Sequence, residues 1–133
     1  MSNHKKLILS VDDEFIITES LRIQLERNFG DTYILEFADS AETGLEILQD
    51  VLHSDISQSL VITDWMMPGI KGDEFAKTIR STYPQTKIIM LTGQVDHTVL
   101  NVIIENNFVD KVIAKPWLEY QIIEAINELI ESK

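Results

Sequence analysis

Short apolar runs rich in branched side chains recur five times along the chain. Most of these runs are continuous rather than alternating, which is typical of strands that helices cover on both faces. The run at residues 33–37 contains Glu36, so we expect it to be an edge strand. The predicted strands are residues 7–11, 33–37, 60–63, 87–91 and 112–114.

Helical periodicity fills the segments between these runs. Apolar residues three or four positions apart predict four helices, and the segment 95–105 has a weaker helical pattern because its β-branched residues are poor helix formers. Ser40 is the expected N-cap of the second helix, and Pro84 should end the third. The predicted apolar stripes are Ile17-Leu21-Leu25, Ala41-Leu45-Leu48 with Val51 or Leu52, Phe75-Ile79-Tyr83, and Leu118-Ile122-Ile126-Leu129.

Alternating strands and helices predict an α/β fold with a parallel sheet. Right-handed crossovers leave few topologies, and we expect a doubly wound five-stranded sheet of order 2-1-3-4-5, the flavodoxin-like (βα)5 arrangement. The first and third strands are then neighbours at the switch point, where ligands bind in such sheets. The length of 133 residues predicts a single domain over residues 1–133.

Composition narrows the class of protein. The chain has 22 acidic and 11 basic residues and a formal charge of −11. An acidic surface repels nucleic acid and anionic membranes, so we expect neither as a partner. Cysteine is absent, which excludes disulfides and thiolate metal sites. No apolar run is long enough for a signal peptide or a membrane span, so we expect a soluble, cytoplasmic protein.

Polar residues with chemical potential end four of the predicted strands. Asp12 and Asp13 follow the first strand, Asp64 the third and Lys115 the fifth, while Thr92 ends the fourth. The carboxyl ends of parallel strands meet at one edge of a sheet, so these side chains should gather in one crevice. Three carboxylates can share a site in ionised form only if a cation joins them, and oxygen ligands favour a hard cation such as Mg²⁺.

Such a crevice suits phosphoryl transfer. With a cation and Lys115 neutralising the charge, Asp64 could attack phosphorus as a carboxylate nucleophile and form an aspartyl phosphate. The Thr92 hydroxyl could donate a hydrogen bond to a phosphoryl oxygen. Pro116 follows Lys115, and a cis peptide bond there would help to aim the lysine at the site. Each residue alone is also common in a cap or a turn, so the prediction rests on their combination.

These motifs resemble the receiver domain of two-component response regulators, and the resemblance covers nearly the whole chain. The matching segments are residues 11–14, 63–69, 72–74, 91–93 and 115–116. The resemblance implies that Asp64 is the phosphoacceptor and that Thr92 and Lys115 hold the phosphoryl oxygens. It also implies Mg²⁺ as cofactor, with Asp13 and Asp64 as direct ligands and Asp12 acting partly through water. The backbone carbonyl of Met66 would complete the protein ligands.

The resemblance also implies partners. The phosphoryl donor would be a phosphohistidine on a sensor histidine kinase or on a histidine phosphotransfer protein. Without an output domain, the chain would act on an unknown downstream protein, which we expect to bind the face made by the fourth helix, the fifth strand and the last helix. It would not be a conventional enzyme, because it transfers a phosphoryl group to itself and hydrolyses it slowly.

One position departs from the family pattern. Many members carry Tyr or Phe three residues before the lysine, where the ring turns inward after phosphorylation, and Val112 occupies that position here. We therefore expect the loop after Thr92 and the helix that follows it to carry the switch instead.

Three other functions would also place acidic residues or a phosphate site on such a fold. A Mg²⁺-dependent aspartyl phosphatase needs an acid two residues after its nucleophile, and Met66 stands there. A flavin-binding electron carrier needs a glycine-rich or hydroxyl-rich phosphate loop after the first strand. This chain instead has the acidic residues Asp12, Asp13 and Glu14 at that place. A pseudo-receiver that binds partners without phosphate remains the main alternative, although the intact acidic cluster, Thr92 and Lys115 argue against it.

Overall fold

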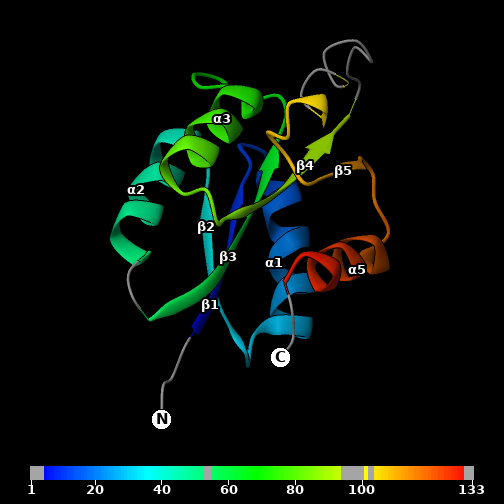
Figure 1. Cartoon of the computed structure of the whole chain (residues 1–133). Helices are drawn as coiled ribbons and strands as arrows, with labels where there is room; N and C mark the ends of the chain where they lie inside the picture. The colour runs from blue at the N-terminus through cyan, green and yellow to red at the C-terminus, as the bar shows by residue number, and fades with distance from the viewer. Residues whose placement is uncertain (1–4, 53–54, 94–100, 102–103, 131–133) are drawn as a thin grey trace.

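A parallel five-stranded sheet of order β2-β1-β3-β4-β5 runs through the centre of the molecule (Figure 1). This computed structural model describes residues 5–52, 55–93, 101 and 104–130. The predicted α/β fold, the strand order and the edge position of the second strand are confirmed. The strands are β1 (Lys5–Val11), β2 (Tyr33–Ala38), β3 (Ile56–Asp64), β4 (Lys87–Thr92) and β5 (Lys111–Ala114).

Helices cover both faces of this sheet (Figure 1). α1 (Phe15–Phe29) and α5 (Glu119–Leu129) pack on one face, while α2 (Ala41–Val51) and α3 (Gly72–Thr82) pack on the other. Most of the weakly predicted helix at 95–105 lies outside the described residues, and the described ones, Asn101, Ile104 and Glu105, are helical. Within the described ranges, no helix combines the length and the apolar character needed to cross a membrane.

The two cores explain why the strand sequences are continuously apolar. Successive side chains of a strand point to opposite faces of the sheet. Leu7 and Leu9 of β1 therefore belong to the core under α2 and α3, whereas Ile8 belongs to the core under α1 and α5. All three are completely buried. A strand in the middle of this sheet thus carries apolar residues on both of its faces.

The ends of the helices agree only in part with the sequence pattern. The Ser40 hydroxyl accepts a hydrogen bond from the Thr43 backbone N–H at 3.1 Å, which confirms the predicted N-cap of α2. α3 ends at Thr82, so Tyr83, predicted as part of its apolar stripe, is the capping residue instead. Leu118 was expected in the last apolar stripe, and this prediction was wrong: it precedes α5 in extended conformation and is 62% exposed.

Gly72 allows the start of α3 to lie directly against the end of β3. Its backbone N–H donates to the carbonyl of Trp65 at 3.1 Å. A Cβ atom at this position would lie 2.3 Å from the carbonyl oxygen of Asp64 and 2.9 Å from the Cα of Trp65. Both of these atoms are backbone, so a larger residue would displace the strand end that carries Asp64.

We therefore predict that Gly72→Ala destabilises the fold by about 1–3 kcal/mol through overpacking against backbone. Chemical denaturation followed by tryptophan fluorescence measures this loss. Gly93→Ala is the matched control, because a Cβ atom there would meet nothing within 4 Å, and its free energy of unfolding should change by less than about 0.5 kcal/mol. Equal unfolding midpoints for the two variants would show that the close approach of α3 is not required.

Candidate functional site

Asp12 and Asp64 lie side by side because of the register of two neighbouring strands. Val11, the last residue of β1, pairs with Thr63 of β3. β3 continues for one more residue, to Asp64, and Asp12 directly follows β1. Only 1% of Asp12 and 4% of Asp64 is exposed. The fold therefore holds two carboxylates together where water hardly reaches them.

Lys115 reaches the same place from β5. Thr92 pairs with Ala114 at the ends of β4 and β5, and the Lys115 backbone N–H donates to the Thr92 carbonyl at 2.7 Å. The Lys115–Pro116 peptide bond is cis, which agrees with the hypothesis drawn from the sequence. The Lys115 Nζ lies 2.9 Å from Asp64 Oδ1 and 3.3 Å from Asp12 Oδ2. The lysine thus forms ion pairs with both buried acids.

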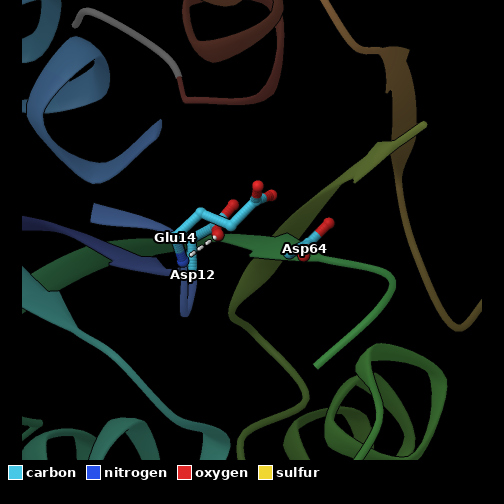
Figure 2. A group of neighbouring side chains, drawn as sticks. All are labelled: Asp12, Glu14 and Asp64. Atoms are coloured by element: carbon cyan, nitrogen blue, oxygen red, sulfur yellow. Dashed lines mark hydrogen bonds between the residues drawn. The ribbon is translucent and has the colours of Figure 1, made fainter. Parts of the chain in front are cut away.

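Glu14 supplies a third carboxylate to this group (Figure 2). Its Oε1 lies 3.3 Å from Lys115 Nζ, and single oxygens of Asp12, Glu14 and Asp64 all lie within 4.8 Å of one another. The Glu14 backbone N–H also donates to Asp12 Oδ1 at 2.8 Å, which fixes the orientation of that carboxylate. Glu14 belongs to the motif at residues 11–14 but was not among the site residues predicted from the sequence. Its longer side chain, directly after two predicted site acids, was the available signal.

The remaining predicted site residues surround this cluster. Asp13 is exposed and is not one of the three acids whose oxygens converge. The Met66 backbone forms a hydrogen bond to the Asp64 carboxylate, while the Met66 side chain is 57% exposed. Thr92 is buried at the end of β4, with 5% of its surface exposed. The roles given to Asp13, to the Met66 carbonyl and to the Thr92 hydroxyl stay predictions.

Burial sets the electrostatics of the cluster. It raises the pKa values of both Asp12 and Asp64 above the ordinary value of aspartate, and the nearby Lys115 offsets only part of this effect. Burial alone would lower the pKa of Lys115, but its hydrogen bond to Asp64 and the charges of Asp12 and Asp64 raise it overall. One ammonium therefore does not fully stabilise these carboxylates, and a further cation would.

The donor atoms fit a hard divalent cation. Each of the three converging residues offers a carboxylate oxygen, the ligand type that Mg²⁺ and Ca²⁺ prefer. The Lys115 ammonium already contacts all three carboxylates, so this position favours positive charge. Asp12, Glu14 and Asp64 could therefore hold a metal ion.

The segment that follows Lys115 is anchored to α1. The indole N–H of Trp117 donates to Gln24 Oε1 at 2.8 Å. Arg27 and Asn28, near the end of α1, both donate to the carboxylate of Glu119, the first residue of α5. These contacts fix the chain that carries the lysine against the helix that begins beside the acids.

Known proteins with similar sequences point to the same family as the motifs of the site. The model of the response regulator receiver domain matches residues 8–127. The chain is 26% identical to the hydrogenase transcriptional regulatory protein HoxA of Cupriavidus necator, over 100% of this chain and 26% of that protein. It is 40% identical to the transcriptional regulatory protein ResD of Bacillus subtilis, over 65% of this chain and 32% of that protein. The chain spans about a quarter to a third of the length of these two relatives.

Solved structures of similar proteins share the fold. A response regulator receiver domain protein from Clostridium thermocellum superposes with a TM-score of 0.82 at 27% identity, over 94% of both chains. A CheY-like receiver domain protein from Methanospirillum hungatei superposes with a TM-score of 0.80 at 29% identity, over 93% of this chain and 92% of that one. Because the family model matches most of the sequence and the fold agrees, this chain belongs to the response regulator receiver domain family.

Proposed function

We propose that this chain is a phosphorylation-controlled switch that accepts a phosphoryl group on Asp64 from a phosphohistidine of a sensor kinase or a phosphotransfer protein. The observation that carries this proposal is the contact of 2.9 Å between Lys115 Nζ and the buried Asp64 Oδ1, beside the carboxylates of buried Asp12 and exposed Glu14. A buried acid in contact with one amine, beside further acids, is an arrangement that suits phosphoryl transfer with a metal ion.

The proposed reaction needs positioning and charge neutralisation. A carboxylate oxygen of Asp64 attacks the phosphorus, the P–N bond of the phosphohistidine breaks, and its electron pair stays on the imidazole. The Met66 backbone and Lys115 orient the Asp64 carboxylate. Lys115 then holds one phosphoryl oxygen, and the Thr92 hydroxyl donates to another. Magnesium, when bound, supplies the positive charge that balances the acids and the phosphoryl oxygens.

The ligands proposed for magnesium are those expected from the sequence. Asp13 and Asp64 would bind it directly, Asp12 would act partly through water, and the Met66 carbonyl would complete the set. The converging oxygens of Asp12, Glu14 and Asp64 support a cation at this place, and Asp13 is adjacent to Asp12 in sequence. A water-bridged Asp12 and an exposed Asp13 leave room for the ordered waters that Mg²⁺ usually keeps.

Exposed apolar side chains near the cluster support a protein as the phosphoryl donor. Phe15 and Ile16 begin α1 shortly after the acids and are 76% and 77% exposed. Met66 follows Asp64 closely, Leu118 follows Lys115 closely, and both are more than half exposed. Large apolar side chains in water mark a contact surface for another macromolecule, whereas a small phosphodonor needs none.

Phosphorylation would act by changing the affinity for a downstream protein. The predicted partner face includes β5 and α5, where Tyr120 is 57% exposed. Most of the fourth helix of that face, and the loop after Gly93 that we expect to move, lie outside the described residues. Val112 is half-buried and packs against the core under α2 and α3, which agrees with a switch that uses no aromatic ring at this position.

Phosphorylation of Asp64 can be tested by mass spectrometry. Incubation with Mg²⁺ and phosphoramidate should add the mass of one phosphoryl group to the wild-type chain. Asp64→Asn should abolish the gain, because an amide is not a nucleophile for phosphorus. Asp31→Asn, which removes an exposed acid after α1, should be labelled like the wild type. A mass gain that survives Asp64→Asn would place the acceptor elsewhere.

The pH dependence of stability should show the cost of the buried acids. An acid whose pKa is raised in the folded state stabilises the fold below its ordinary value, and this contribution is lost as the pH rises through the raised value. Asp12 and Asp64 therefore weaken the metal-free fold above the ordinary aspartate value of 3.8. The raised pKa of Lys115 has no effect in this window, because its contribution is lost only at alkaline pH.

We therefore predict that, at neutral pH in a chelator, Asp12→Asn has a higher melting temperature than the wild type. The difference in melting temperature should shrink as the pH falls toward the ordinary pKa of aspartate, because Asp12 of the wild type then becomes neutral like the asparagine of the variant. Addition of Mg²⁺ should raise the melting temperature of the wild type more than that of the variant, since ligand binding stabilises only the folded state. A pH-independent difference between the two proteins would argue against buried charge as its cause.

The exposed apolar residues beside the cluster should affect the rate of phosphoryl transfer from a protein donor but not from a small phosphodonor. Ile16→Asn and Leu118→Asn should each slow transfer from a phosphorylated histidine kinase that labels the wild-type chain, by roughly tenfold, or about 1.4 kcal/mol. Labelling by phosphoramidate should be unchanged. Ile104→Asn alters an exposed apolar residue that follows β4 and should leave both rates unchanged. Equal slowing of both donors would instead indicate damage to the site.

A further inference from the structure

Glu14 differs from the other two acids of the cluster in its exposure. The side chains of Asp12 and Asp64 are 1% and 5% exposed, whereas that of Glu14 is 62% exposed. It nevertheless reaches Lys115 and has an oxygen within 4.8 Å of those of both buried acids. Figure 2 shows its side chain extending from the end of β1 toward Asp64. Glu14 is therefore the outer carboxylate of the cluster, on its solvent side.

The charges around Asp64 determine how Glu14 affects an incoming phosphoryl group. Asp12 and Asp64, together with the adjacent Asp13 proposed as a ligand, carry three negative charges, which a divalent cation and the Lys115 ammonium would just balance. Glu14 pairs with the same ammonium at 3.3 Å and adds one further negative charge beside Asp64. A phosphoryl group that contacts Asp64 and Lys115 therefore comes close to this carboxylate. The barrier from Glu14 thus rises with the negative charge that the donor carries.

We propose that Glu14 is a specificity-determining residue that selects phosphoryl donors by their charge. It slows transfer from small dianionic donors and has less effect on donors whose carrier group brings compensating positive charge. This inference rests on the proposed function of Asp64 as phosphoacceptor. In each case the Asp64 oxygen forms the new bond to phosphorus, the bond from phosphorus to the carrier breaks, and the carrier leaves with the electron pair.

Two small donors allow a direct test. Acetyl phosphate is a dianion at neutral pH and releases acetate, whereas phosphoramidate is a monoanion because its nitrogen is protonated and releases ammonia. Phosphorylation of wild type and Glu14→Gln would be followed by intrinsic tryptophan fluorescence, to which Trp65 beside the acceptor contributes, at saturating Mg²⁺. Glu14→Gln should speed labelling by acetyl phosphate roughly tenfold and by phosphoramidate roughly threefold. High salt should reduce both effects, because it screens exposed charges.

Glu26→Gln is the matched control. It removes the same charge from an exposed position in the last turns of α1 and should leave both rates unchanged. The inference is overturned if Glu14→Gln changes the two rates by the same factor or not at all. It is also overturned if Glu14→Gln slows both donors and raises the Mg²⁺ concentration for half-maximal rate, since Glu14 would then be a metal ligand. Failure of both donors to label the wild-type chain would instead refute Asp64 as phosphoacceptor, and this inference with it.

Discussion

Uncompensated negative charge at the carboxyl edge of the sheet is the constraint on which the site depends. The strand register brings Asp12 and Asp64 together, and burial makes their ionised forms costly. Lys115 offsets part of this cost and contacts both acids. The fold therefore becomes more stable when a cation binds beside Asp12 and Asp64. A cation or a phosphoryl group with its cation would therefore be bound at the place where the fold is electrostatically weakest.

Much of this arrangement could be predicted from the sequence, because parallel strands obey strict geometric rules. Once five covered strands alternate with helices, the residues that follow the strands must share one edge. The positions of Asp12, Asp64, Thr92 and Lys115 follow from that rule without any knowledge of side-chain conformation. The family match over residues 8–127 agrees with the same motifs. Strand order and edge position were likewise predictable, since interrupted apolar patterns identify a strand with an exposed side.

Features that depend on local backbone and side-chain conformation were not predictable in this way. Glu14 joins the cluster because the chain turns after β1 and a flexible side chain extends back to Lys115. Leu118 matches the helical period of α5 but lies before its first residue, in extended conformation. β3 begins at Ile56, before the apolar run at residues 60–63 from which this strand was predicted. Periodicity identifies elements and their buried faces, whereas such ends are decided by a few local contacts.

The anchoring of residues 117–119 to α1 has a consequence for molecular recognition. Trp117 and Glu119 are held by Gln24, Arg27 and Asn28, so the two segments that carry the exposed Ile16 and Leu118 are already joined in the free protein. A macromolecule that binds both segments does not need to fix their relative position, because the hydrogen bonds between them already do so. Little conformational entropy is lost on association, and even a brief encounter can be specific.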